Sequence, residues 1–361
     1  MSTSFDLRRV LAGYQPVFCT AEHLYLMRRG YLYRTDHELG TLSKIARIPA
    51  DRPLMSRGPR IFERIFRTAV QSAAQCDPDT LLLARRSRIW RVDLNTGEVS
   101  LDLVVPQGRS LLALSRISSN RTGTEWLVFG EYLHNPKRAE VRLWRRHCEK
   151  EARWEIAATF PAGEIDHVHA IQQLSDGRVF VLTGDFDEAA GVWETDADLS
   201  GVRPQMRGRQ QFRACWWFEQ DGNIIYGTDS QFESNTLLML QLNDGLLDVV
   251  QELPGSCIYH GRTGRDLVFS TTVEPGGSTG SFTRDMLSRA VGPGITGDPT
   301  IFFYSGKLSK VFSSPKDGWP SRLGQFGTFM FPAGVAPKDR IYAYGVAVKK
   351  YDGDCLVFEK T

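Results

Sequence analysis

One pattern recurs four times in the middle of this chain: a short apolar run ends in a small residue, and a carboxylate follows it. The copies span residues 127–131, 180–185, 224–229 and 268–274. They recur about every 45 residues, which is the length of one β-propeller blade. Because every blade repeats the same strands, we expect equivalent positions to lie on one ring around the axis. The pattern therefore predicts four acids at one mouth of a central channel: Glu131, Asp185, Asp229 and Glu274.

The rest of the chain consists of short β-rich segments between Gly, Asp, Asn and Pro turns, and long stretches of helical periodicity are absent. This pattern is typical of an all-β protein. We expect the innermost strands of the blades at residues 17–22, 67–74, 111–117, 167–174, 213–219, 257–262 and 327–332. Seven such strands predict a seven-bladed β-propeller, with six blades as the alternative, formed by residues 1–361 as one domain.

The last predicted blade lacks a fourth strand, because the chain ends soon after Glu359. Residues 5–11 form an apolar and charged segment that could supply this strand. Pairing of the first and last elements would close the ring and remove exposed sheet edges, which otherwise favour aggregation. We therefore expect the N-terminal strand to complete the last blade.

Composition narrows the range of partners. The 361 residues include 44 basic and 42 acidic side chains, a net charge of +2, so there is no electrostatic reason to expect nucleic acid as a partner. No segment approaches the ~20 apolar residues of a membrane span, and the first residues lack the apolar core of a signal peptide. The expectation is a cytoplasmic protein without a membrane span, whose oligomeric state stays open.

The propeller geometry predicts where polar residues meet. The start of each innermost strand and the end of each second strand lie at the same face of a propeller, so residues at these positions become neighbours. The first set is Arg67, His167, His169, Arg213, Tyr259 and His260. The second set is Glu131, Tyr132, Asp185, Asp187, Asp229 and Glu274. Basic groups that face several acids around a small bowl are typical of a site for an acidic or heavily hydroxylated ligand.

His167 and His169 are two residues apart, so a strand would place both imidazoles on one face. Such a pair could act in acid–base chemistry, bind a metal, or form a hydrogen-bonded structural pair. The candidate catalytic residues are His167, His169, Glu131, Asp185, Asp229, Tyr259 and His260. No cofactor is assigned; if a divalent metal binds, its expected ligands are His167, His169 and Asp185.

Arg67 and Arg213 each open an expected innermost strand and precede small residues. A planar, permanently charged guanidinium suits a carboxylate or sulfate on a sugar. The alternative is that each arginine forms an ion pair with an acid of a neighbouring blade. The candidate substrate-binding residues are Arg67, Arg213, Tyr132 and Glu274.

The segments around 129–144, 167–172, 183–193 and 226–229 resemble the sialidase-like, BNR-repeat propellers of bacteria. The resemblance covers about residues 110–275. The Asp box of that family, S-x-D-x-G-x-x-W at the turn between third and fourth strands, is present in worn copies. These copies are Thr35-Asp36 with Gly40, Thr195-Asp196 with Gly201, and Asp317-Gly318-Trp319. The resemblance implies the same propeller fold.

Sialidases hold the sugar carboxylate with three arginines and use a Tyr–Glu nucleophile pair with an acidic Asp. The resemblance implies that Arg67 and Arg213 bind the carboxylate, with Arg262 or Arg116 as the third arginine. No Tyr–Glu pair can be assigned, so sialidase activity itself is not expected. Propeller polysaccharide lyases are similar in plan: a His or Tyr removes the proton beside a uronate carboxylate that Arg or a metal neutralises.

Two classes of function follow. The first is a carbohydrate-active enzyme with its site at the central bowl, acting on an acidic glycan of the uronic- or sialic-acid type. It would be a glycoside hydrolase through paired carboxylates or a polysaccharide lyase through His and Tyr. The second is a non-catalytic propeller that binds a glycan or a protein in the assembly of a surface polysaccharide. Propellers host enzymes and scaffolds alike, so the fold does not decide between them.

Overall fold

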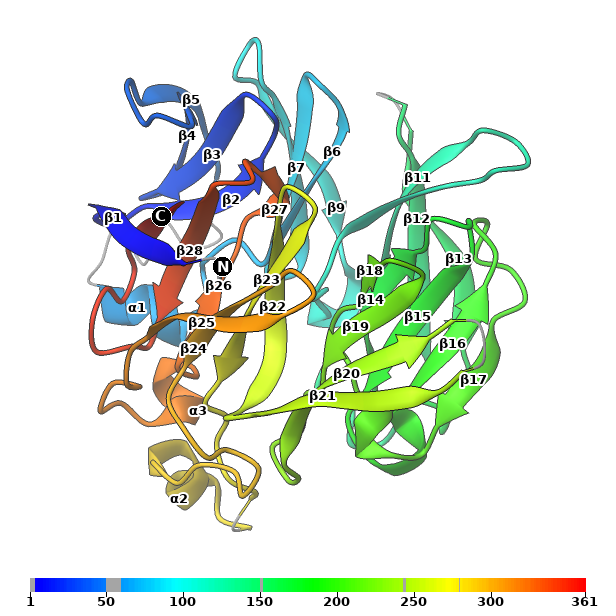
Figure 1. Ribbon diagram of the computed structural model, residues 1–361. Helices are drawn as coiled ribbons and strands as arrows, with labels where there is room; N and C mark the ends of the chain where they lie inside the picture. Colours follow the sequence, from blue (N-terminus) through cyan, green and yellow to red (C-terminus); the bar gives the residue numbers. More distant parts are fainter. Residues whose placement is uncertain (1–3, 50–59, 150–151, 243–244, 279) are drawn as a thin grey trace. The chain divides into compact units, whose positions relative to one another are not determined.

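The computed structural model describes residues 4–49, 60–149, 152–242, 245–278 and 280–361. The chain divides into two compact units (Figure 1). Unit 1 comprises Met1–Val70, Ser230–Asn235 and Glu252–Thr361, and unit 2 comprises Gln71–Asp229 and Thr236–Gln251. The expectation of one domain over residues 1–361 stays a prediction.

Unit 2 consists of four antiparallel sheets of four strands, each formed by strands consecutive in the chain. The first sheet is β6 (Ser72–Asp77), β7 (Thr80–Arg85), β8 (Arg88–Asp93) and β9 (Val99–Val104). The second is β10 (Ser115–Ser118), β11 (Glu125–Gly130), β12 (Val141–His147) and β13 (Glu155–Phe160). The third is β14 (His167–Gln173), β15 (Val179–Gly184), β16 (Gly191–Thr195) and β17 (Arg203–Arg207). The fourth is β18 (Phe218–Gln220), β19 (Asn223–Gly227), β20 (Asn235–Gln241) and β21 (Leu247–Leu253), whose end residues extend into unit 1.

Aspartates shape the turns between the third and fourth strands of several sheets. Asp93 Oδ1 accepts hydrogen bonds from the backbone N–H groups of Asn95, at 3.0 Å, and Thr96, at 2.8 Å. Asp196 Oδ1 accepts in the same way from Ser200, at 2.8 Å. An aspartate that bonds the backbone a few residues on stabilises a tight turn without a repeated consensus sequence. The worn Asp-box position Asp196 therefore has a structural role here.

Apolar side chains of neighbouring sheets pack against each other in unit 2. One cluster joins the second and third sheets and includes Val128, Leu143, Val168 and Trp193, all buried. A further cluster joins the first and second sheets around Leu82, Leu127 and Phe129. The second strands are apolar on both faces because each sheet is covered on both sides. This explains the apolar runs of the repeated sequence pattern.

Unit 1 contains one four-stranded sheet and one nine-stranded sheet. The four-stranded sheet is β26 (Thr328–Met330), β28 (Arg340–Val346), β29 (Cys355–Lys360) and β1 (Phe5–Leu11). One part of the larger sheet is β2 (Gln15–Cys19), β3 (His23–Arg28), β4 (Tyr31–Asp36) and β5 (Ser43–Arg47). The other part is β22 (Ser256–Thr263), β23 (Asp266–Thr272), β24 (Thr300–Tyr304) and β25 (Leu308–Ser313). Between the two parts lies β27 (Ala333–Ala336).

The number of separate blades differs from the number predicted from the sequence. The described strands form five separate four-stranded sheets, not seven or six. β27 runs parallel to β2, pairing Cys19 with Gly334, and parallel to β22, pairing Arg262 with Val335. Gly334 is required there, because it has a φ of 82° and a Cβ would lie 2.0 Å from the Cys19 carbonyl oxygen. The all-β β-propeller fold is confirmed, whereas the seven-blade count is wrong.

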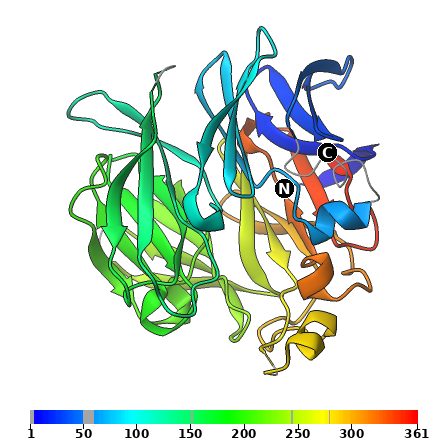
Figure 2. The same cartoon turned by 180° about the vertical axis from the view of Figure 1, so that it is seen from behind.

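The N-terminal strand pairs as expected. β1 runs antiparallel to β29, with Phe5 opposite Lys360 and Leu11 opposite Cys355. The first strand of the chain therefore completes the sheet of the last strands. The Thr361 N–H donates to the Ser4 carbonyl at 3.0 Å, and both views show blue β1 beside the red last strands of unit 1 (Figure 1 and Figure 2).

Helices are short. The α-helices α1 (Arg60–Ile65), α2 (Phe282–Leu287) and α3 (Ser321–Gly324) all belong to unit 1. The 3₁₀ helices η1 (Pro106–Gly108), η2 (Asp187–Ala189) and η3 (Gln210–Phe212) belong to unit 2. Among the described residues, no helix has the length and apolar character needed to cross a lipid bilayer.

Candidate functional site

Five predicted site residues of unit 2 form one group: three surround a carboxylate oxygen of Asp185, and Asp229 joins through Arg213. We call this group the histidine cluster; its members are His167, His169, Asp185, Arg213 and Asp229. Asp185 Oδ1 lies 3.2 Å from His167 Nε2, 3.3 Å from His169 Nε2 and 3.0 Å from Arg213 Nη2. The histidines open the innermost strand β14 and the two aspartates follow second strands, as the sequence predicted. Arg213 does not open a strand: it follows η3 (Gln210–Phe212), and β18 begins only at Phe218, so the strand expected over residues 213–219 is wrong.

The two histidines begin β14 and are held by backbone carbonyl groups. His167 Nδ1 lies 2.9 Å from the Leu133 oxygen, and His169 Nδ1 lies 2.9 Å from the Ala214 oxygen. Their Nε2 atoms lie 3.1 Å apart. The expectation that both imidazoles share one face of the strand is confirmed. Because each ring is bonded at Nδ1, its Nε2 is fixed in direction.

The small residues of the repeated pattern make room for this strand. A Cβ on Gly184 would lie 2.3 Å from Cε1 and 2.4 Å from Nε2 of His169, so only glycine leaves space for the imidazole. A Cβ on Gly130 would lie 2.3 Å from Cβ of Val168. Both glycines end a second strand, where β14 approaches closely. The glycines therefore allow the cluster to form.

Asp185 follows Gly184 and is positioned by its own backbone. Its N–H donates to Asp166 Oδ2 at 3.0 Å, and its carbonyl accepts from Gln210 Nε2 at 2.9 Å. Asp166 in turn lies 3.2 Å from Arg138 Nε. These contacts fix the direction from which the Asp185 carboxylate enters the cluster.

Arg213 joins two carboxylates. Its Nη2 lies 3.0 Å from Asp185 Oδ1 and 3.3 Å from Asp229 Oδ2. Cys215 Sγ donates to the same Asp229 oxygen at 3.3 Å. Burial raises the pKa of the Cys215 thiol well above its usual value, and the Asp229 charge adds to this effect. Cys215 is therefore a protonated donor to Asp229.

Two opposing effects, burial and neighbouring charges, determine the pKa values of Asp185 and His167. Burial acts to raise the pKa of Asp185, but Arg213 and His167 outweigh it, so this pKa lies well below the usual value. Burial acts to lower the pKa of His167, but the Asp185 charge and hydrogen bond outweigh it, and the pKa of His167 is raised. The cluster is therefore built around an ionised carboxylate.

Exposure differs within the cluster. The His169 side chain is 1% exposed and that of Asp185 is 23% exposed. Tyr132 is half-buried beside the cluster, with its ring centroid 4.3 Å from that of His167. Solvent and ligands therefore reach the cluster on the side of Asp185.

Glu131 is at the repeated carboxylate position but does not join the cluster. It is fully buried and bonded to the guanidinium of Arg109. Trp144 Nε1 and the backbone N–H of Arg142 each donate to it at 3.1 Å. Three donors from its own part of unit 2 occupy this carboxylate. The catalytic assignment of Glu131 is therefore not supported by its surroundings.

The other four predicted site residues belong to unit 1. Arg67 does not open a strand: it lies in a turn after α1, is exposed, and has its guanidinium 5.9 Å from the Phe326 ring centroid. Glu274 is buried and accepts a hydrogen bond from Ser256 Oγ. Tyr259 and His260 are in β22 and partly buried. Adjacent positions on a strand point to opposite faces, so their side chains do not converge.

His260 predicts a pH effect on stability. Burial lowers its pKa from 6.5 to about 4, and Arg262 adds to the shift. Below about pH 6.5 the unfolded chain binds a proton that the folded chain does not, so stability falls with pH towards about 4, by up to about 3 kcal/mol. Urea unfolding of a His260→Gln variant should show a smaller loss between about pH 7 and about pH 4.5. An exposed-site variant, His134→Gln, should behave like the native protein; equal pH dependence of all three proteins would contradict this role.

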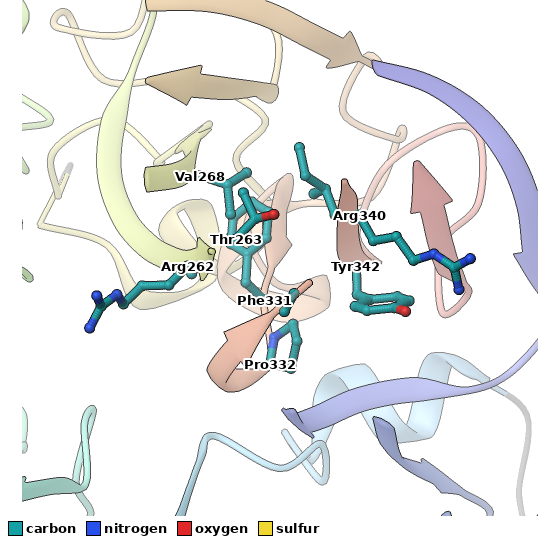
Figure 3. A pocket seen from close by; sticks show the side chains of 10 residues that line it. Arg262, Thr263, Val268, Phe331, Pro332, Arg340 and Tyr342 are labelled. Atoms are coloured by element: carbon teal, nitrogen blue, oxygen red, sulfur yellow. The ribbon is translucent and has the colours of Figure 1, made fainter. Parts of the chain in front are cut away.

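A small pocket lies in unit 1, away from any converging charged groups. Its lining includes Arg262, Val268, Phe331, Arg340 and Tyr342. Figure 3 shows that the two guanidinium groups point in opposite directions, away from the apolar centre. Arg340 Nη2 is paired with Glu38 Oε1 at 2.7 Å. The pocket therefore lacks the arginine arrangement that a carboxylate site requires, and Arg262 does not act as a third arginine there.

Arg116, the other candidate third arginine, is paired with Glu125 on the exposed surface of unit 2. Residues that sequence reasoning missed are Cys215, Asp166 and Gln210. The available sequence signal for Cys215 was its position: it lies two residues after Arg213, as His169 lies two residues after His167. Asp166 directly precedes His167, whereas no local signal marks Gln210.

Comparison with known proteins supports the fold alone. No model of a protein family matches the chain, and no curated protein sequence matches it. A chain in the crystal structure of the Mitotic Checkpoint Complex is similar with a TM-score of 0.55 and 12% identity, covering 98% of this chain and 91% of that chain. A structure of PorZ, a surface component of the type-IX secretion system of Porphyromonas gingivalis, gives 0.52 and 13% identity. That match covers 99% of this chain and 38% of PorZ.

At such low identities these likenesses indicate a β-propeller and nothing about activity. A luciferin-regenerating enzyme also aligns, with a TM-score of 0.49 and 10% identity over 86% of this chain and 98% of that chain. This score is too low to carry an argument. The resemblance to sialidase-like propellers stays a prediction.

Proposed function

We propose that this protein acts on an acidic glycan of the uronic- or sialic-acid type at the histidine cluster, as a polysaccharide lyase. One observation carries the proposal: two imidazoles and a guanidinium converge within 3.3 Å of Asp185 Oδ1, at the partly exposed side chain of the cluster. Nitrogen groups gathered in this way suit the carboxylate of an acidic sugar. The sequence resemblance to sialidase-like propellers supports the same class of substrate.

The burial and ion pairing of the carboxylates favour elimination over hydrolysis. A glycoside hydrolase needs two carboxyl groups about 5 to 9.5 Å apart that both reach the sugar. In unit 2, Glu131 and Asp229 are buried and are held by Arg109 and Arg213. Only Asp185 of these three is partly exposed. Glu131, Asp185 and Asp229 therefore do not supply a hydrolytic pair.

A lyase needs a cationic group and a base. The cationic group neutralises the uronate carboxylate, and the base removes the proton on the adjacent carbon. Arg213, paired with Asp185 Oδ1 at 3.0 Å, is the cationic group in our proposal. Tyr132, half-buried beside His167, is the proton acceptor in our proposal. As the phenolate, Tyr132 takes the proton while the C–H bond breaks. The C–H electron pair forms the C=C bond and the C–O bond to the glycosidic oxygen breaks. The Tyr132 hydroxyl then returns its proton to that oxygen.

The test is a panel of polyuronates, sialylated glycans and neutral glycans. The near-ultraviolet absorbance of an unsaturated uronate reports elimination, and new reducing ends without that absorbance report hydrolysis. We expect the native protein to form the absorbing product and Tyr132→Phe to lower kcat about 100-fold or more. The exposed-site variant His134→Ala should retain full activity. Reducing ends without absorbance would overturn the lyase assignment.

A second candidate is a propeller that binds an acidic glycan or a protein without cleaving it, in the assembly of a surface polysaccharide. The observation that favours it is burial: His167, His169 and Arg213 are each less than 5% exposed. Groups that do chemistry must contact their substrate, whereas a binding surface needs only Asp185 and Tyr132. Retention of a glycan by the native protein without any product would favour this candidate.

A further inference from the structure

We propose that His167, His169 and Asp185 bind a divalent transition metal ion, of which Zn²⁺ and Mn²⁺ are the probes. The site lies entirely within unit 2. Their ligand atoms lie within 4.8 Å of one another. The metal site does not depend on the glycan proposal, since metal binding is measured without any glycan.

The hydrogen bonds of the two imidazoles fix which ring nitrogen carries the proton. A backbone carbonyl oxygen only accepts hydrogen bonds, so Nδ1 of His167 and Nδ1 of His169 must each carry a proton. In a neutral ring, Nε2 is then a bare acceptor. Two such acceptors lie 3.1 Å apart and face the Asp185 Oδ1 acceptor at 3.2 and 3.3 Å. Arg213 Nη2 lies 3.0 Å from Asp185 Oδ1, but the two facing Nε2 atoms still need a proton or a metal ion between them.

A proton serves this arrangement less completely than a metal ion. A proton on His167 Nε2 links that atom to only one of the other two, His169 Nε2 or Asp185 Oδ1, and Arg213 Nη2 lies 3.0 Å from the same Asp185 oxygen. A divalent ion accepts a lone pair from all three atoms at once. The triangle of acceptors therefore favours a metal ion.

The edges of the triangle measure 3.1, 3.2 and 3.3 Å. Ligands about 2.1 Å from a zinc ion are about 3.0 Å apart at octahedral angles and about 3.4 Å apart at tetrahedral angles. An ion about 2.1 Å from all three atoms would lie about 1 Å from their plane. Two imidazoles and one carboxylate on one face of an ion leave open positions for water or a ligand.

Hydrogen bonds from surrounding groups hold the three ligand residues in place. Metal-bound histidines donate their other N–H to a carbonyl or carboxylate, which fixes the ring and raises its basicity. Leu133 and Ala214 provide this for the two imidazoles. Asp166 and Gln210 hold the backbone of Asp185. The ligands are thus positioned before a metal arrives.

Arg213 bridges Asp185 and Asp229, so these three side chains sum to one negative charge. A divalent ion would convert this to one positive charge at the partly exposed edge of the cluster. That charge is the one an anionic ligand needs, so the metal strengthens a carboxylate site.

An alternative set of ligands is less suited to a metal. His169, Cys215 and Asp229 also lie within ligand distance of one another. Both aspartates pair with Arg213 Nη2, but Asp229 Oδ2 also accepts a hydrogen bond from Cys215 Sγ, which would have to be given up. All three residues are buried, so an ion held there would lack access to solvent. The site therefore uses Asp185.

The test uses chelator-stripped native protein and Zn²⁺ or Mn²⁺ alone. Titration calorimetry and metal analysis after dialysis should give about one ion per chain, and the ion should raise Tm because it binds only the folded state. His169→Ala and Asp185→Asn should each weaken binding by at least about 100-fold. His134→Ala, which changes an exposed histidine of the same unit, should bind like the native protein.

The Asp185→Asn variant keeps the size of the side chain, so its result stands even where His169→Ala fails to fold; circular dichroism separates the two cases. Binding that is unchanged in Asp185→Asn, or a native protein that retains neither ion after dialysis, would overturn the site. A protein that binds metal but cleaves no glycan would overturn the proposed lyase function and leave the metal site standing.

Discussion

Replacement of Glu131 by alanine is expected to lower the free energy of unfolding by about 3–5 kcal/mol. The fully buried carboxylate balances Arg109 and accepts from Trp144 Nε1 and the Arg142 N–H. Its removal leaves a buried guanidinium without its partner and two donors without an acceptor, and such groups are costly to bury. Urea unfolding of the variant measures the loss directly.

The matched control is Glu140→Ala, a change a few residues away on the same connection. Glu140 pairs with Arg142 on the surface, with a side chain that is 48% exposed. Screened surface pairs contribute about 0–1 kcal/mol, so this variant should differ little from the native protein. Equal losses in the two variants would contradict a structural role for Glu131 and return it to the candidate catalytic residues.

A Gly184→Ala variant is expected to be about 1–3 kcal/mol less stable than the native protein. A Cβ at this position would overlap the His169 imidazole, at 2.3 Å from Cε1. The ring must shift or the strands must separate, and either change moves His169 Nε2 away from Asp185. The variant should therefore also bind Zn²⁺ more weakly than the native protein does.

A double-mutant cycle isolates this contact. In Gly184→Ala with His169→Ala the overlap is gone, so the two losses of stability should not add, and the double variant should recover part of the loss. The control is Gly318→Ala, because no atom lies within 4 Å of the new Cβ there. Additive losses in the cycle would show that Gly184 has another role.

Much of this arrangement was accessible from the sequence because strands alternate with a fixed period. The period of two placed His167 and His169 on one face, and the repeated apolar run located the ends of second strands next to them. Asp185 and Asp229 follow second strands as expected, but Arg213, which pairs with both, follows η3 (Gln210–Phe212) and does not open a strand. The ends of second strands depend on local sequence, so the positions of the two histidines and the two aspartates were predicted correctly, whereas the strand expected from Arg213 was not.

The sequence did not predict which arginine pairs with each carboxylate. Glu131 and Asp185 occupy equivalent positions of the repeat, yet one pairs with Arg109 and the other with Arg213. The choice depends on which long side chain reaches the carboxylate across the fold. Equivalent positions therefore predicted a shared location but not a shared role.

Two other errors have local causes. Arg67 follows a helix turn and has a φ of 48°, a conformation incompatible with a strand start. β27 was missed because its four residues, Ala333–Ala336, carry no alternation of large apolar side chains. Its parallel pairing with β2 and β22 joins strands that a count of repeats treats as separate sheets.

The central claim is that His167, His169, Asp185 and Arg213 form the functional centre of unit 2 by holding a metal ion beside an acidic sugar. A crystal structure with Mn²⁺ and a uronic acid disaccharide, analysed by anomalous scattering, tests it most directly. We predict an anomalous peak at bonding distance from His167 Nε2, His169 Nε2 and Asp185 Oδ1, and density for the sugar carboxylate beside the ion. Ordered side chains without a peak among them, or a sugar bound elsewhere in the protein, would contradict the account.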